Sequence, residues 1–139
     1  MDMKLELVVI PFSDMDRAKM FYADQLGFNL DHEVRVSDEH RVIQLTPPGS
    51  ACSIALQMRP PSGTVDMPPP RRLQLVTPDV HAVRAQLVER GVEVSKVQLF
   101  HGGSFRPAHE GDPLDYSRFV FFSDPEGNAW ALQQMPGRD

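Results

Sequence analysis

The chain has 139 residues and a formal net charge of -5, with 41% hydrophobic and 24% charged residues. These proportions are typical of a globular protein with the length of one domain. The negative charge disfavours contact with a nucleic-acid backbone, and no apolar run approaches the roughly 20 residues of a membrane-spanning helix. The single cysteine, Cys52, cannot form an internal disulfide, and the first residues lack the pattern of a signal peptide. We therefore expect a cytoplasmic protein that binds neither nucleic acid nor membrane.

The first half begins with the pattern of a strand followed by a helix. A short apolar run occupies residues 5–10, and Ser13-Asp14 is typical of a helix start. Apolar residues then recur at helical spacing up to Gly27. Residues 28–30 have the composition of a strand. The sequence thus predicts a strand, a helix that ends at a glycine, and a second strand.

A proline-rich segment divides the chain near its middle. Five of the 13 prolines lie between Arg59 and Pro70. Such a composition is typical of a stiff, extended linker.

The second half repeats the order of the first. Residues 73–76 form an apolar run, Asp79 offers an N-cap, and a helical stripe of apolar residues ends at Gly91. Residues 92–94 again have the composition of a strand. An internal repeat of this kind indicates two related structural modules.

The repeat continues to the end of each half. Residues 41–49, with a Pro-Pro-Gly turn, are followed by strand-like residues 54–58. Residues 118–127, with an Asp-Pro-Glu-Gly turn, are followed in the same way by residues 131–135. Each pair predicts a strand, a turn and a returning strand.

Together these patterns predict an α+β fold of two βαβββ modules, with eight strands and two helices outside. The first module spans residues 4–58, the linker 59–70 and the second module 71–135, all within one domain of residues 1–139. One module cannot bury its sheet alone, so we expect the two to pack together around a half-open cleft for a small molecule.

Two motifs carry a resemblance to a known family. The segment from Ile10 to Phe28 resembles the opening of glyoxalase, bleomycin-resistance and related dioxygenase proteins, and Asp124-Pro-Glu-Gly-Asn-Ala-Trp130 resembles their closing turn. The chain is thus similar to the vicinal-oxygen-chelate (VOC) superfamily, which implies the glyoxalase-like fold and a homodimer. Members include metal-dependent isomerases, epimerases, thiol transferases and dioxygenases, and also metal-free proteins that sequester a drug.

The metal-ligand positions that the resemblance implies hold no ligands here. The first falls on Leu7, the second within residues 68–76, which contain no His, Asp or Glu, and the third on Ala131. Glu6 would be a ligand only after a one-residue slip, which turns it to the other face of the strand. We therefore expect no metal and no other cofactor.

The segment from His101 to Ser117 is longer than its counterpart in the first half and contains three glycines. This length and composition predict a lid beside the cleft that becomes ordered on ligand binding. A mobile polar loop without chemistry is the equally weighted alternative. A new metal site of His101, His109 and Glu110 or Asp112 is a further possibility.

Candidate site residues follow from chemistry and position. His101 is the candidate general acid or base, and Tyr116 is the second candidate catalytic residue, as a hydrogen-bond donor to an oxygen-bearing ligand. The candidate ligand-binding residues are Arg118, Gln133, Arg41, Gln44, Gln74 and Trp130. For Arg41 and Arg118, pairing with nearby acids is the stronger alternative. His81 is expected to be a surface residue of the second helix, so its replacement should affect binding little.

Three functions stay open at this point. We prefer a metal-free cleft protein that binds or sequesters a small molecule. The second is a metal-free enzyme of lyase or isomerase type, and the third is a metal-dependent glyoxalase-like or dioxygenase-like enzyme with unconventional ligands. The empty ligand positions argue against the third, whereas the sequence does not separate the first two.

Overall fold

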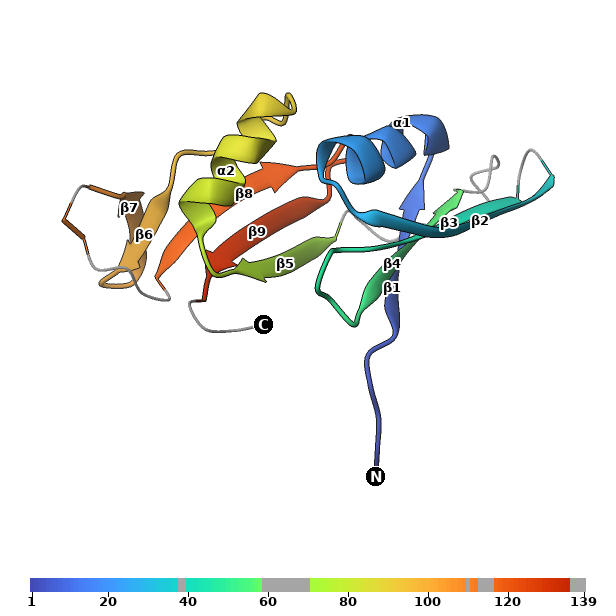
Figure 1. Cartoon of the computed structure of the whole chain (residues 1–139), viewed down its shortest axis with the longest axis horizontal. Helices are drawn as coiled ribbons and strands as arrows, with labels where there is room; N and C mark the ends of the chain where they lie inside the picture. Colours follow the sequence, from blue (N-terminus) through green and yellow to red (C-terminus); the bar gives the residue numbers. More distant parts are fainter. Residues whose placement is uncertain (38–39, 59–70, 110, 113–116, 136–139) are drawn as a thin grey trace. The chain divides into compact units, whose positions relative to one another are not determined.

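The computed structural model describes residues 1–37, 40–58, 71–109, 111–112 and 117–135. The chain forms two compact units, Met1–Pro69 and Pro70–Asp139, each built from one β-sheet and one helical segment (Figure 1). The proline-rich segment at residues 59–70 lies outside the described residues.

The first unit holds a four-stranded sheet. Its elements are β1 (Leu7–Phe12), α1 (Met15–Lys19), a π-helical continuation η1 (Met20–Gln25), β2 (Asn29–Ser37), β3 (His40–Thr46) and β4 (Ser53–Met58). The strand order is β1-β4-β3-β2, with β1 parallel to β4 and the other neighbours antiparallel. The predicted meander is therefore β2-β3-β4, and the first strand joins it at the β4 edge.

The second unit repeats this plan with one added strand. Its elements are β5 (Arg72–Thr77), α2 (Val80–Glu89), β6 (Gln98–His101), β7 (Ser104–Pro107), β8 (Arg118–Ser123) and β9 (Ala129–Gln134). The strand order is β5-β9-β8-β6-β7, with β5 parallel to β9. The fold class predicted from the repeat, α+β with two βαβββ modules, is confirmed.

Both helices begin and end where the sequence predicts. The Asp14 side chain accepts a hydrogen bond from the amide of Arg17, and Asp79 accepts one from Ala82, each at 3.1 Å. Gly27 and Gly91 follow the helices with φ of 75° and 82°, a conformation that costs glycine little.

The strand prediction for the second half needs two corrections. The described residues contain nine strands rather than eight, because part of the predicted loop at 101–117 forms β7. Gly102 and Gly103, with φ of 62° and 83°, make the two-residue turn that pairs β7 with β6. In addition, residues 92–94 form only an isolated bridge, Val94 with Phe122, and the strand starts at Gln98.

Each helix covers one face of its own sheet. In the second unit, the buried cluster of Val80, Val97, Val120 and Leu132 joins α2 to β8 and β9. Since successive strand residues point to opposite faces, the alternate residues of these strands point away from α2. We call this second surface the open face of the five-stranded sheet.

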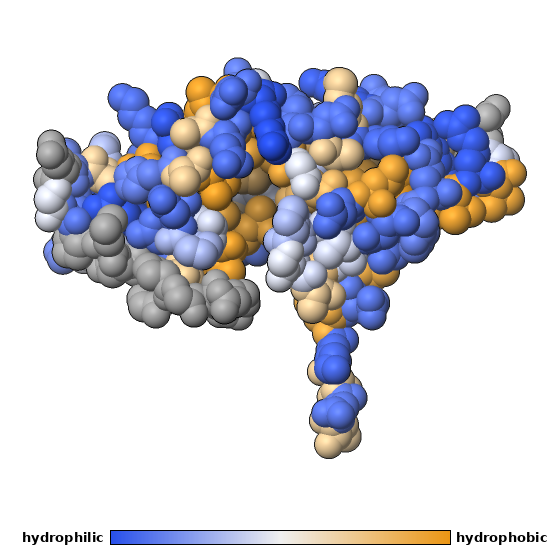
Figure 2. Space-filling view, in the orientation of Figure 1, coloured by the Kyte–Doolittle hydropathy of each residue, from blue (hydrophilic) through white to orange (hydrophobic). Residues whose placement is uncertain are grey.

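Some apolar side chains remain at the surface. The outer end of the β2–β3 hairpin carries hydrophobic surface (Figure 2), where Val34 and Val36 are 50% and 80% exposed. None of the described helices is long and apolar enough to cross a membrane.

Candidate functional site: an aromatic trough on the five-stranded sheet

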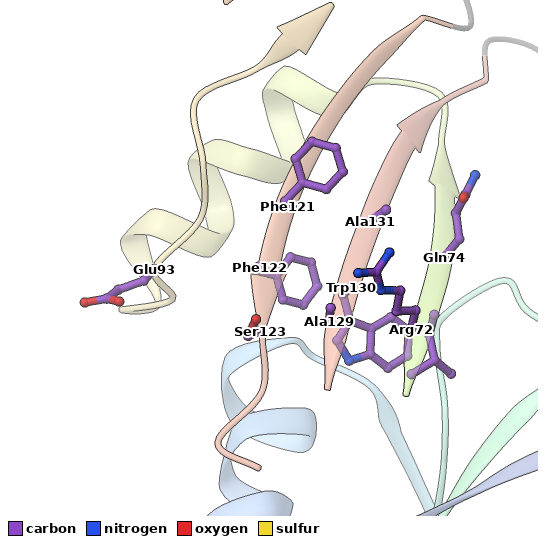
Figure 3. A pocket seen from close by; sticks show the side chains of 10 residues that line it. Arg72, Gln74, Glu93, Phe121, Phe122, Ser123, Ala129, Trp130 and Ala131 are labelled. Carbon is purple, nitrogen blue, oxygen red and sulfur yellow. The ribbon is translucent and has the colours of Figure 1, made fainter. Parts of the chain in front are cut away.

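The open face of the second unit is hollowed into a shallow trough of about 640 Å³, within the usual range for small-molecule sites. Its lining residues are Arg72, Leu73, Gln74, Glu93, Phe121, Phe122, Ser123, Ala129, Trp130 and Ala131. The hollow arises because two small residues, Ala129 and Ala131, occupy the open face of β9, the strand between β5 and β8. Larger side chains on the neighbouring strands form its sides (Figure 3).

The strand register places a polar side chain on one side of Ala131 and an aromatic side chain on the other. This residue pairs with Gln74 of β5 on one side and with Phe121 of β8 on the other. Figure 3 shows these three residues on adjacent strands. A molecule lying over Ala131 would therefore contact an amide at one edge and a phenyl ring at the other.

Four phenylalanines continue the aromatic side along the same face. The Phe105 ring packs against Phe100, Phe119 and Phe121, with centroid distances of 4.9, 5.4 and 5.2 Å. Phe100 and Phe105 are 44% and 46% exposed, so the cluster presents aromatic surface to solvent. Contiguous apolar surface exposed in this way is a feature of interaction and ligand-binding sites.

The opposite side of the trough is polar. The Gln74 amide nitrogen donates to the side-chain oxygen of Gln133 at 2.6 Å. This bond orients the two amides, because Gln74 must present its nitrogen to its neighbour and Gln133 its oxygen. Both residues were predicted from the sequence to bind a ligand. Gln74 lines the trough and Gln133 is hydrogen-bonded to it, and their ligand-binding role stays a prediction.

The side of the sheet that faces α2 carries a different polar group. Arg118, 5% exposed, donates to Nε2 of His81 at 2.7 Å and to the main-chain oxygen of Asp112 at 2.8 Å. Because a guanidinium has only donors, His81 accepts with an unprotonated Nε2. His81 is exposed, as predicted for a surface helix residue, but it also fixes a buried arginine.

Asp112 connects the β6–β7 hairpin to the hydrogen-bonded pair of Arg118 and His81. Its carboxylate accepts two hydrogen bonds from Arg106, at 2.9 and 3.1 Å, and one from the amide of His109 at 2.6 Å. These bonds hold the pKa of Asp112 far below its usual value of 3.8. The Asp112 carboxylate is thus engaged by an arginine, which disfavours the alternative of a metal site with His101 and His109; Glu110, the other carboxylate of that alternative, lies outside the described residues.

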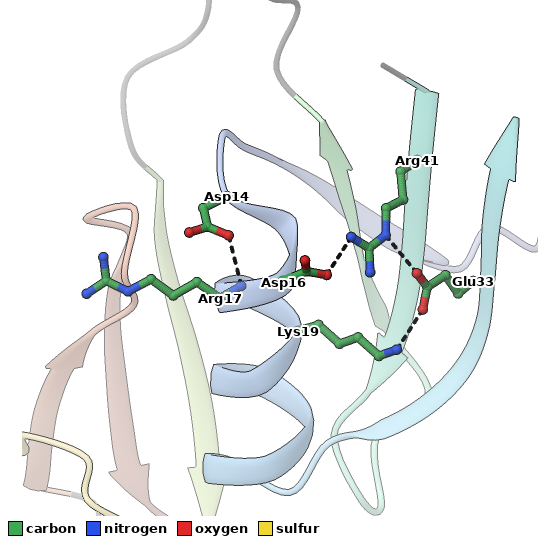
Figure 4. A network of polar contacts seen from close by, with 6 residues as sticks. All are labelled: Asp14, Asp16, Arg17, Lys19, Glu33 and Arg41. Atoms are coloured by element: carbon green, nitrogen blue, oxygen red, sulfur yellow. Dashed lines mark hydrogen bonds and ion pairs between the residues drawn. The ribbon is translucent and has the colours of Figure 1, made fainter. Parts of the chain in front are cut away.

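In the first unit, Arg41 pairs with nearby acidic side chains, which is the alternative to ligand binding that the sequence favoured. Its guanidinium pairs with Asp16 and with Glu33, both at 2.7 Å, and Glu33 also pairs with Lys19 at 2.8 Å (Figure 4). The hydrogen bonds from Lys19 and Arg41 lower the pKa of Glu33 below its usual value of 4.5. This network joins α1 to β2 and β3.

The other candidate residues are spread over several places. Gln44 lies on β3 of the first unit, on the face opposite the buried Ile43 and Leu45. Trp130 and Phe122 also line the trough, although both belong to the helix-facing side of their strands; Trp130 is 3% exposed and its ring stacks on that of Phe122 with a centroid distance of 6.2 Å. Gln44 and Trp130 stay predictions as ligand-binding residues, and the structure does not place Gln44 in the unit that holds the trough.

His101 ends β6, where it pairs with Ser104 at the tip of the hairpin. Because side chains alternate, it points to the face opposite that of Phe100 and the aromatic cluster. Tyr116 lies outside the described residues. The structure thus brings neither proposed catalytic residue to the trough among the parts it describes, and their catalytic roles stay predictions.

The structure also locates the residues at the metal-ligand positions that the family resemblance implies. Leu7 is in β1, Ala131 lies at the centre of the trough, and Glu6 is exposed just before β1. Within the described part of the chain, no three His, Cys, Asp or Glu side chains are grouped closely enough to hold a metal ion.

Sequence reasoning missed the aromatic cluster. The alternation of Phe119 and Phe121 in one predicted strand was a signal that both point to the same face. The contributions of Phe100 and Phe105 had no comparable signal, because they depend on a hairpin that was expected to be a loop.

Two βαβββ units, one of which carries a trough lined by aromatic and amide side chains, define a small-molecule-binding protein with the glyoxalase-like fold. The chain belongs to the Glyoxalase/Bleomycin resistance protein/Dioxygenase superfamily, whose profile matches residues 4–132. No curated protein sequence matches the chain.

Several solved structures are similar over nearly the whole chain. TnmS3, an antibiotic binding protein from Streptomyces sp. CB03234, is 33% identical with a TM-score of 0.67, covering 96% of this chain and 97% of its own. A glyoxalase/bleomycin resistance protein from the same organism is 32% identical with a TM-score of 0.64, covering 94% and 100%. A superfamily member from Sphaerobacter thermophilus DSM 20745 is 26% identical with a TM-score of 0.70, covering 96% and 98%.

Proposed function

We propose that this protein binds and sequesters a small antibiotic that carries a flat aromatic ring system, and that the trough of the five-stranded sheet is its binding site. The observation that carries the proposal is the aromatic side of the trough, where Phe121 and the packed Phe105 and Phe119 present rings beside the alanine floor. Stacking on such rings favours a flat ligand with delocalised electrons. The similarity to TnmS3, described as an antibiotic binding protein, supports the ligand class.

Sequestration is preferred over catalysis because of the chemistry of the lining. The residues that line the trough include two alanines, two phenylalanines and a glutamine, but no histidine or cysteine. A proton shuttle near neutral pH is most often a histidine. A metal-free lyase or isomerase would have to use Glu93, whose carboxylate points outward, or a group from elsewhere, for which His101 and Tyr116 are the sequence candidates.

Calorimetric titration of the purified protein with a panel of aromatic antibiotics tests the proposal. We expect at least one member to bind with a micromolar or lower Kd and to be recovered unchanged, as mass spectrometry after long incubation would show. Expression of the protein in a sensitive host should raise the inhibitory concentration of that same compound. Conversion of the bound compound to a product would favour the enzyme instead, and failure of the whole panel would contradict antibiotic binding.

We further propose that the function needs no metal. Leu7 and Ala131 cannot ligate an ion, and Asp112 is engaged by Arg106. Elemental analysis of protein purified without chelators should therefore find far less than one zinc, iron, nickel or manganese per chain. The expectation would be refuted if the protein contained about one equivalent of any of these metals and if a chelator that removed the metal also abolished ligand binding.

The family resemblance leads us to propose a homodimer in the cytoplasm. The strands β2 and β7 end their sheets, and paired subunits commonly cover such edges. Light scattering at micromolar concentration should give twice the chain mass of 15.6 kDa. A mass equal to that of one chain over the same concentration range would contradict the proposal.

A further inference from the structure

The trough carries opposite charges at the two ends of one row of residues. Arg72 of β5 pairs with Ala129 of β9, which pairs in turn with Ser123 of β8. The bridge between Val94 and Phe122 places Glu93 beside Ser123 at the far end. With strands about 4.8 Å apart, this row of four residues spans about 14 Å, roughly the length of three fused aromatic rings with one substituent.

The cation of this row is available to a ligand. Arg72 is exposed, and its guanidinium forms no hydrogen bond or ion pair with another side chain in the part of the chain that the structure describes. Its guanidinium is directed from β5 toward β9, whereas the carboxylate of Glu93 points outward from the edge of β8 (Figure 3). Ala129 is too short to fill the space between the two charged ends, which leaves room for a ligand group beside Arg72.

We infer that the ligand is an aromatic acid, a flat ring system with a carboxylate, phenolate or enolate oxygen at one end. Its acidic oxygen pairs with Arg72, and its rings lie over Ala129 and Ala131 against Phe121. A guanidinium fork matches a carboxylate with two parallel hydrogen bonds, and partial removal of water in the trough strengthens this pairing. The reversed orientation is disfavoured, because the acidic oxygen would lose Arg72 as its partner and would lie at the end of the row that carries the negative charge of Glu93. This inference rests on the proposed function and adds the charge and direction of the ligand.

Three fluorescent probes of equal ring size test the inference: anthracene-2-carboxylate, its neutral carboxamide, and 2-(aminomethyl)anthracene. The wild-type protein should bind the carboxylate about tenfold more tightly than the carboxamide, which corresponds to about 1.4 kcal/mol, and bind the amine most weakly. Arg72→Gln should abolish this preference, so that the carboxylate and the carboxamide bind with affinities within about twofold of each other. Arg72→Lys should retain part of the preference.

Two control variants separate local pairing from net charge. Arg90→Gln, at the end of α2, removes the same charge but should leave the carboxylate preference unchanged. Glu93→Gln should keep the preference for the carboxylate and should not strengthen amine binding, since it removes a negative charge that attracts the ammonium.

The possible outcomes distinguish this inference from the proposed function. Phe121→Ala should weaken all three probes by a similar factor, because the rings are common to them. Equal affinities of the wild-type protein for the three probes, or an Arg72→Gln effect no larger than that of Arg90→Gln, would overturn the aromatic-acid inference while the Phe121→Ala result still supports an aromatic site. Wild-type protein that binds none of the probes at millimolar concentration would overturn both.

Discussion

Replacement of Ala131 by tryptophan is expected to abolish ligand binding while leaving the protein folded. Ala131 lies between Gln74 and Phe121 at the centre of the trough, and its side chain points away from α2. A tryptophan there projects into the space that the ligand needs instead of into the core. We expect the affinity for anthracene-2-carboxamide, or for an antibiotic found by screening, to fall by about 100-fold or more, equivalent to about 2.7 kcal/mol.

Val76→Trp provides the matched control for this variant. Val76 lies on β5, on the same face of the sheet as Ala131. It is 41% exposed and does not line the trough. The same added bulk at this position should change the affinity by less than about threefold. Thermal unfolding of both variants verifies that they fold. Retention of wild-type affinity in Ala131→Trp would show that the ligand binds elsewhere, and equal losses in the two variants would show that bulk anywhere on this face is sufficient.

The second large effect concerns stability, at the turn between β8 and β9. Asn128 is 2% exposed; its side-chain oxygen accepts from the amide of Arg71 at 2.6 Å, and its nitrogen donates to Asp124 at 2.8 Å. The other carboxylate oxygen of Asp124 accepts from the amides of Glu126 and Asn128. These bonds tie the closing turn to the residue that precedes β5.

Asn128→Ala is therefore expected to lower the free energy of unfolding by about 2–4 kcal/mol, because it leaves a buried amide and a buried carboxylate oxygen without these partners. Asn29→Ala, at the exposed start of β2, removes the same side chain and should cost less than about 0.5 kcal/mol. Urea denaturation of the two variants measures the difference. Equal midpoints would mean that the turn contributes nothing beyond an ordinary surface loop.

Local patterns in the sequence were sufficient for the elements that depend on neighbouring residues. Asp14 and Asp79 cap their helices, and Gly27 and Gly91 end the helical segments, because capping and left-handed turns involve only a few consecutive residues. The repeated order of these signals was enough to predict the two βαβββ modules. Alternation along a strand also fixes which face each residue shares, so the side chains of Gln74 and Gln133 can meet on one face, while their ligand-binding role stays a prediction.

The aromatic site needed the tertiary structure. Phe105 reaches Phe119 and Phe121 only because the Gly102-Gly103 turn folds β7 back on β6, which itself pairs with β8. Strand order and register are set by contacts between segments that are distant in the sequence, so short-range patterns do not reveal them.

Contacts between segments that are distant in the sequence also explain the positions of Arg118 and His101. Arg118 meets His81 because α2 packs across the strand that carries the arginine, 37 residues away in the chain. His101 was singled out by its chemistry, but the pairing of β6 with β7 turns it to the face opposite the phenylalanines. The sequence by itself determined the modules, the caps and the absence of ligands at Leu7 and Ala131. Only the assembled sheet decided which side chains share one surface, because that depends on the register of five strands at once.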